Sequence, residues 1–111
     1  MAYLIHENTW PWGQAIAIMT GDAAGMVEIS LETDHPGGAY LKGVSVIPSR
    51  RRQGIAKRML HYALELCQSR GVTYVELDAE PDAHVLHLYE SFGFKPFPAN
   101  EYGQIPMLLR F

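Results

Sequence analysis

The densest positive charge of the chain lies immediately before an apolar segment with helical spacing. Three arginines at residues 50–52 run into Gln53 and Gly54, where the helical pattern begins. A helix N-terminus already carries positive partial charge and unpaired N–H groups, so added cations are unfavourable there unless an anion binds. A glycine at this point lets the backbone approach a ligand closely. These residues therefore predict a phosphate or diphosphate site at the start of the helix.

The loop differs from the common phosphate-binding motifs. It lacks the Lys-Ser/Thr end of a Walker A loop and the G-x-G-x-x-G spacing of dinucleotide-binding folds. Five of the nine Lys and Arg residues fall within residues 50–58, whereas the whole chain of 111 residues carries a formal charge of −3. This distribution fits a local anion site better than general nucleic-acid binding.

The elements that would position this site show two periodicities. Apolar runs at 15–19 and 26–31 around a turn-rich loop predict a β-hairpin, and residues 39–47 predict a third strand that ends at Pro48. From residue 54 to about 70 the apolar spacing becomes 3.6, which predicts a helix packed on a sheet. Further along we expect a strand at 72–77, a helix at about 82–92, closing strands at 94–97 and 104–111, and a short first strand at 3–6.

This order predicts an α/β fold with a central mixed, mostly antiparallel sheet and two main helices. The strand–helix–strand crossover implies one parallel pair of strands beside antiparallel hairpins. The length suits a single domain over residues 1–111.

Two motifs then give a family resemblance. "RRQGIA" at 51–56 resembles the (Q/R)-x-x-G-x-(G/A) motif of the GNAT superfamily of acyl-CoA N-acyltransferases, and the strand "VSVIP" precedes it as in that family. "LHLYESFGFKP" at 86–96 looks like the family's LYxxxGF segment, in the family's order and with a strand between the motifs. The resemblance covers about residues 39–111. It implies a GNAT-like fold and transfer of an acetyl group from acetyl-CoA to a primary amine, in a short, N-terminally reduced member.

The resemblance also implies which residues hold coenzyme A. Its pyrophosphate would bind backbone N–H groups of residues 51–56, and its pantetheine arm would pair with the strand at 44–46. A backbone N–H near Val46 would stabilise the oxyanion of the tetrahedral intermediate. We expect Arg50, Lys57 and Arg58 to be peripheral charges. The expected cofactor-binding residues are Val44, Ser45, Val46, Arg51, Arg52, Gln53, Gly54, Ile55 and Ala56.

Tyr89 and one carboxylate are the expected catalytic residues. Tyr89 corresponds to the family tyrosine near the thioester sulfur, where a phenol can protonate the leaving thiolate. Its helical spacing alone would favour a core residue instead. Carboxylates that could accept the amine proton are Glu28, Glu32, Glu76 and Asp78, of which we prefer Glu76. No activated Cys or Ser nucleophile is visible, so the amine would attack the thioester directly in a ternary complex.

Several other notable side chains are expected to be structural. Asp82 stands where the family often has asparagine, and its residue type favours a helix N-cap. His84 and His87 are expected on the surface, since no further zinc ligands accompany them, and we expect no metal. Cys67 lies on the apolar helix face and should be buried and inert. The tryptophans within residues 10–12 could cover the acceptor site, form a dimer interface, or plug the end of the sheet.

The N-terminal part departs from the family pattern. Only about residues 7–13 separate the first strand from the hairpin, which is too short for the two helices that usually wall the acceptor site. Either the acceptor pocket is open, or a partner subunit supplies the wall, and we expect a homodimer. A single cysteine, no apolar run near 20 residues and no signal-like N-terminus indicate a cytoplasmic protein without a membrane or nucleic-acid partner.

Two other functions stay open at this point. The chain could be a non-catalytic coenzyme A-binding module with a degenerate acceptor site. It could also be an interaction domain in which residues 50–52 bind an acidic partner.

Overall fold

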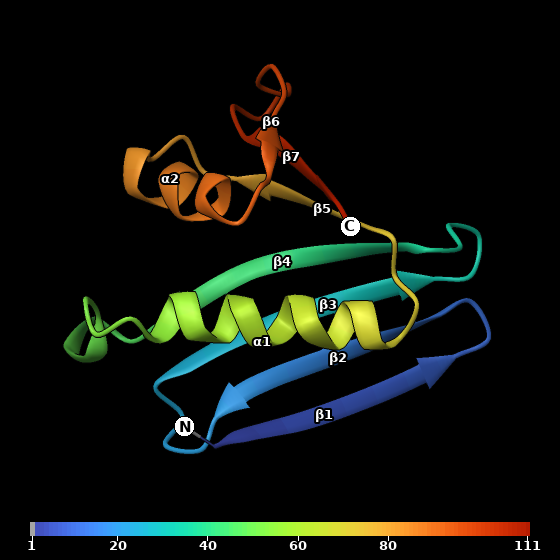
Figure 1. The fold of residues 1–111 in the computed structure, drawn as a ribbon, viewed down its shortest axis with the longest axis horizontal. Coiled ribbons are helices and arrows are strands. Elements are labelled where there is room, and N and C mark those ends of the chain that lie inside the picture. The colour runs from blue at the N-terminus through green and yellow to red at the C-terminus, as the bar shows by residue number, and fades with distance from the viewer. Residues whose placement is uncertain (1) are drawn as a thin grey trace.

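A seven-stranded mixed sheet with the strand order β1-β2-β3-β4-β5-β7-β6 forms the molecule (Figure 1). The computed structural model describes residues 2–111. Its strands are β1 (Tyr3–Trp10), β2 (Gly13–Thr20), β3 (Gly25–Glu32), β4 (Gly38–Val46), β5 (Tyr74–Ala79), β6 (Lys95–Pro96) and β7 (Ile105–Arg110). Its helices are α1 (Ile55–Ser69), α2 (Ala83–Ser91) and a short 3-10 helix, η1 (Pro48–Arg50). The α/β fold class, with two main helices and one parallel strand pair, is confirmed.

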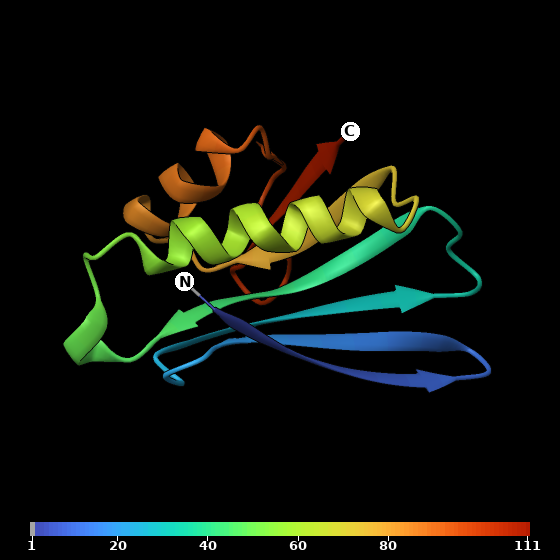
Figure 2. The same cartoon turned by 60° about the horizontal axis from the view of Figure 1, so that its bottom comes forward.

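Both α-helices lie on the same face of the sheet (Figure 2). The apolar positions of α1 recur at helical spacing and pack against alternate residues of the strands, as the change of period predicted. Each large aliphatic side chain buried there stabilises the fold by about 1.5–3 kcal/mol. Core residues from α1 and the strands include Ile55, Met59, Leu60, Ala63, Ile16, Ile18, Val27, Ile29, Leu41, Val75 and Leu77. Across residues 2–111, no helix has the length and apolar character needed to cross a membrane.

The opposite side of the sheet, which we call the open face, carries no helix of residues 2–111. It presents the alternate strand positions, among them Glu28, Ser30, Tyr40, Glu76 and Asp78. The core and the open face are therefore separated by the sheet itself, since successive side chains of a strand point to opposite faces.

Strand β1 is longer than predicted. It pairs with β2 from Tyr3, opposite Thr20, to Trp10, opposite Gly13. Most of its side chains are exposed, so no apolar alternation marks residues beyond position 6 as a strand. A two-residue turn leads directly into β2, so no helix lies between these strands, as their spacing predicted.

The parallel pair β4 and β5 is short and then separates. Residues Gly38–Tyr40 pair with Tyr74–Glu76, and in the described chain no further residues of β4 pair with β5. Beyond this point β4 and β5 diverge (Figure 1), and we call this divergence the split. The split leaves one backbone edge of β4 without a neighbouring strand. Such an edge can accept an extended ligand.

Candidate active site

A β-bulge shapes the free edge of β4. The register with β3 shifts between Leu41, which faces Ile29, and Val44, which faces Val27. Gly43 lies in the bulge with φ +105°, a conformation that side chains rarely adopt. Sequence reasoning did not identify this bulge, although a glycine inside a strand pattern is a signal for one.

The bulge sets which amides face the split. The Ile47 N–H donates to Ala24 O at 2.8 Å, toward β3. Because N–H directions alternate along a strand, the N–H groups of Val44 and Val46 point away from β3, toward the split. The Ser45 N–H points back to β3, and the Ser45 side chain is exposed. Residues 44–46 thus have the orientation expected of a pantetheine partner, while their role as a binding site stays a prediction.

Tyr89 lies beside this edge. It comes from α2, is only 4% exposed, and its ring packs edge-on against Phe94 with centroids 5.7 Å apart. A Cβ on residue 43 would lie 3.8 Å from the Tyr89 hydroxyl oxygen. Burial raises the pKa of Tyr89, and a hydrogen bond with the Val44 backbone offsets part of that rise. A protonated phenol therefore stands next to the split at neutral pH.

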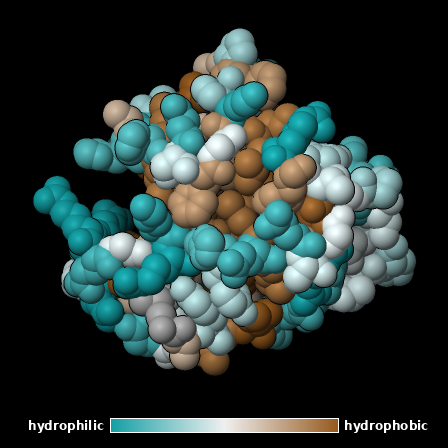
Figure 3. All heavy atoms as spheres, in the orientation of Figure 1, coloured by the Kyte–Doolittle hydropathy of each residue, from teal (hydrophilic) through white to brown (hydrophobic). Residues whose placement is uncertain are grey.

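Apolar atoms surround the same region on the helix side. In Figure 3 they gather between α1 and the part of the sheet that carries α2. Among the partly buried apolar residues that pack on the core, Val44 and Val46 come from the edge of β4 itself. An apolar surrounding strengthens electrostatic interactions at a reacting centre.

The segment between β4 and α1, which we call the anion loop (residues 47–54), has an unusual backbone. Arg52 has φ +65° and Gly54, the N-cap of α1, has φ +74°. No side chain caps the first turn of α1 at Gly54, so its N–H groups face outward without a side-chain partner there. A Cβ at Gly54 would meet only Arg58 Nη1, at 3.9 Å. The chain therefore uses glycine here for its backbone conformation and for access, not to avoid an internal clash.

Arginines in the anion loop and in the first turns of α1 bond to the protein itself. Arg51 Nε donates to Val46 O at 3.1 Å, and Arg58 Nη2 donates to Gln53 O at 3.1 Å. Arg50 forms an ion pair with Asp22 on the β2–β3 turn. Arg50 and Arg58 therefore have partners within the protein, and their expected place at the periphery of the donor site stays a prediction. Sequence reasoning did not identify Asp22, because its partner lies 28 positions away.

Glu76 lies on the open face, on the other side of the sheet from Tyr89. It is level with Tyr40, which places it roughly 10 Å along the strand from Gly43 at about 3.3 Å per residue. The structure therefore does not bring Glu76 and the Tyr89 hydroxyl into direct contact. Glu76 lines a cavity of about 240 Å³ together with Ser30, Glu32, His35, Gly38, Ala39, Tyr40 and Tyr74.

Asp78 lies two residues beyond Glu76, toward the open end of the split. Its carboxylate accepts a hydrogen bond of 2.9 Å from the Tyr40 hydroxyl. Burial and this partner raise the pKa of Tyr40 to about 12. Glu76 and Asp78, the two candidate bases on β5, therefore both lie on the open face, as their alternation along the strand predicted. Asp78 is the closer of the two to the level of Gly43 along the strands.

The remaining residues singled out from the sequence have structural positions. Asp82 is the N-cap of α2 and accepts from the N–H groups of residues 84 and 85 at 2.8 and 3.2 Å, which confirms that expectation. His84 and His87 are exposed on α2.

Cys67 is buried, and this burial raises the pKa of its thiol to about 11. The tryptophans within residues 10–12 are 43% and 66% exposed and stack on each other, so they do not plug the sheet.

Solved structures with the same fold include enzymes of acetyl transfer. An acetyltransferase from Bacillus subtilis in complex with CoA superposes with a TM-score of 0.73 at 17% identity, covering 99% of both chains. The ribosomal-protein-S18-alanine N-acetyltransferase from Escherichia coli gives 0.72 at 21% identity, over 92% of this chain and 71% of that one. PaiA N-acetyltransferase from Thermoplasma acidophilum in complex with coenzyme A gives 0.73 at 16% identity, over 87% and 60%.

Comparison with protein families tests the resemblance independently. No curated protein matches the sequence. The family model of the acetyltransferase (GNAT) family matches residues 3–94, which include the split, the anion loop and Tyr89. A match over this much of the chain, together with the mixed sheet and its one parallel pair, shows that the chain belongs to the acetyltransferase (GNAT) family.

Proposed function

We propose that the protein is an N-acetyltransferase that transfers an acetyl group from acetyl-CoA to a primary amine in a ternary complex. The observation that carries this proposal is a buried, protonated Tyr89 hydroxyl beside the free edge of β4. A coenzyme A module without catalytic function has no need of an acid at that point. Family membership and the coenzyme A named for two structures of the same fold support the choice of donor.

The donor would lie along elements already described. Its pyrophosphate would bind N–H groups of residues 51–56 at the start of α1, where the helix dipole favours an anion. Its pantetheine arm would pair with residues 44–46 as an added strand. This arrangement puts the thioester carbonyl near the N–H of Val46, which points to the split, and the sulfur near Tyr89.

The chemistry then uses both faces of the sheet. The substrate's ammonium group approaches from the open face and loses one proton through water to a carboxylate, and the neutral amine then forms the new C–N bond at the thioester carbon. The tetrahedral intermediate collapses with cleavage of the C–S bond, and Tyr89 gives its proton to the departing thiolate. The second proton leaves the nitrogen and returns to the Tyr89 oxygen through water. The products are the amide and the free thiol of coenzyme A. We assign the base role to Glu76, with Asp78 as the alternative because it lies nearer along β5.

The cavity on the open face, where we propose that the acceptor amine binds, favours a positively charged substrate. Glu32 and Glu76 line the cavity on the open face beside the rings of Tyr40 and Tyr74. Carboxylates and aromatic rings both attract an ammonium group. In residues 2–111 no helix lies between β1 and β2 or on this face of the sheet, so we also propose that the protein acts as a homodimer in which a second copy walls the acceptor site. We further propose a cytoplasmic location.

An amine panel tests the proposed activity. Purified protein is incubated with acetyl-CoA and with small diamines, amino acids or peptides that have a free N-terminal amino group, and the released thiol is measured. The proposal predicts release that depends on a cationic amine. Protein that binds coenzyme A, seen as a rise in melting temperature, but releases no thiol with any amine would contradict the catalytic proposal and favour a binding module.

Two matched variants assign the base. Glu76→Gln and Asp78→Asn keep side-chain size and remove the charge. The variant of the true base should lose turnover and the acidic limb of its pH profile, while the other keeps both. Full activity in both variants would remove the base role from β5. For oligomeric state, light scattering that shows an active monomer at micromolar concentration would refute the dimer.

A further inference from the structure

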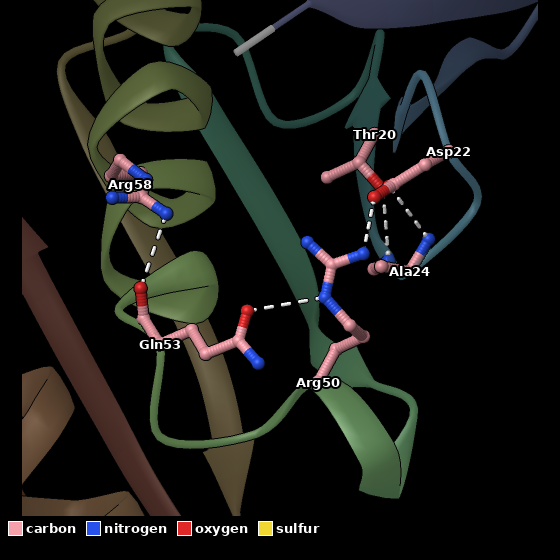
Figure 4. A network of polar contacts seen from close by, with 7 residues as sticks. Thr20, Asp22, Ala24, Arg50, Gln53 and Arg58 are labelled. Atoms are coloured by element: carbon pink, nitrogen blue, oxygen red, sulfur yellow. Dashed lines mark hydrogen bonds and ion pairs between the residues drawn. The ribbon is translucent and has the colours of Figure 1, made fainter.

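Asp22, on the turn between β2 and β3, lies outside the residues assigned to either substrate. Its carboxylate nevertheless reaches the anion loop: Arg50 Nη1 donates to Asp22 Oδ2 at 2.6 Å (Figure 4). The Arg50 Nε donates to Gln53 Oε1 at 3.1 Å. We call this set of three side chains, Asp22, Arg50 and Gln53, the Asp22 bridge.

The bridge starts from a hydrogen-bonded turn. The Ala24 N–H donates to Asp22 Oδ1 at 3.2 Å, and the fully buried Thr20 accepts from the Gly25 N–H at 3.0 Å. Hydrogen bonds from Thr20, Arg50 and Ala24 lower the pKa of Asp22 to about 2. The carboxylate is therefore fixed in direction and remains charged throughout the range in which enzymes are assayed.

The bridge ends on the part of the loop that most needs support. Arg52 has a left-handed backbone, φ +65°, which is unfavourable for a residue other than glycine and persists only when its surroundings hold it. Arg50 and Gln53 flank it on both sides, and their side chains are joined across it. The Gln53 carbonyl in turn accepts from Arg58 of α1, so the support continues into the helix.

We propose that Asp22 is a positioning residue for the acyl donor: through Arg50 and Gln53 it holds the anion loop in the shape that presents its N–H groups to the diphosphate. This rests on the proposed function of the loop. It gives Arg50 a role distinct from direct phosphate contact, because its guanidinium is already engaged by a carboxylate and an amide oxygen. It also couples the β2–β3 turn to the donor site.

The test measures coenzyme A affinity by calorimetry, together with KM for acetyl-CoA, kcat and melting temperature. Asp22→Asn removes the charge but keeps an oxygen for the turn, and Arg50→Gln removes the other partner. Each should weaken donor affinity and raise KM about two- to fivefold, the range expected of an exposed ion pair, with kcat unchanged. The double variant should bind coenzyme A no more weakly than either single variant, because both substitutions act through the same bridge. Arg50→Lys should recover part of the loss.

The matched control is Glu7→Gln, which breaks the ion pair of Glu7 with Arg70 at the far end of α1. It should leave donor affinity unchanged. Donor affinity of Asp22→Asn equal to that of the control, or a fall in melting temperature with unchanged affinity, would overturn the positioning role. The two proposals fail separately: a wild-type protein that binds coenzyme A but acetylates no amine contradicts the activity, and the affinity measurements still decide the bridge.

Discussion

Replacing Gly54 by alanine should weaken coenzyme A binding as well as destabilise the fold, whereas the same change at Gly71 should only destabilise the fold. Gly54 has φ +74° at the start of α1, and a Cβ there would meet only Arg58, at 3.9 Å. Gly71, just past the end of the same helix, offers a matched control. It has φ +80°, and a Cβ there would meet nothing within 4 Å. The two positions thus share the backbone strain of the substitution, and only one faces the proposed donor.

The magnitudes follow from this pairing. A left-handed backbone costs a non-glycine residue about 1–2 kcal/mol. In a domain of roughly 100 residues, each kcal/mol lowers the melting temperature by about 4–8 °C. Both variants should show a loss of this size. Gly54→Ala should in addition lower the affinity for coenzyme A by about tenfold or more, which is 1.4 kcal/mol, because the new Cβ takes space beside the diphosphate.

Thermal unfolding without ligand and calorimetric titration with coenzyme A measure the two quantities separately. The reasoning requires similar melting temperatures in Gly54→Ala and Gly71→Ala, with near wild-type affinity in Gly71→Ala alone. Equal losses of affinity in both variants would show that the strain of the helix, and not access at the anion loop, controls binding. Unchanged affinity in Gly54→Ala would remove the diphosphate from this position.

Three further outcomes follow from the titratable groups. Tyr89→Phe should lower kcat strongly while leaving donor affinity near wild type, and unchanged turnover in the variant would refute the acid role. Because the pKa of Tyr89 is raised, its ionisation should not reduce the turnover of the wild-type protein below about pH 10. The pKa of Asp22 falls from 3.8 to about 2 on folding, so its stabilisation is complete above pH 3.8 and is lost as the pH falls through about 2. Acid unfolding of Asp22→Asn should lack this component; identical acid curves would contradict it. With its pKa raised to about 11, buried Cys67 should react with thiol reagents at neutral pH only as fast as the protein unfolds, and rapid labelling of the native protein would argue against that burial.

Periodicity predicted the elements whose burial is one-sided. The helix α1 and the strands β2, β3 and β4 were found within a few residues of their observed bounds, because each presents an apolar face at its own repeat. The edge strand β1 has mostly exposed side chains and was predicted too short for that reason. The Asp82 cap was predictable because capping depends on residue type and a local bond.

The parts of the candidate site that sequence could not predict depend on contacts between distant residues. The partner of Arg50 lies on a turn 28 positions earlier, and nothing near either residue indicates the pairing. The separation of Glu76 from Tyr89 likewise depends on the face of the sheet on which α2 packs and on the register of β4 and β5, which sets the level of Glu76 along the strands. The left-handed backbone of Arg52 has no residue-type signal at all.

The split has a consequence for the order in which the chain folds. Strands β1 to β4 form three successive hairpins, whose ends meet through short turns. The pairing of β4 with β5 instead requires closure of a long loop that contains all of α1, and it is sustained by only three residue pairs. Loop closure over that length costs entropy before any contact repays it, so the four-strand meander should form first and β5 should join late. The place where the donor is proposed to bind is then also the seam between an early and a late folding unit, and a strand-like ligand lying in it would tie the two together.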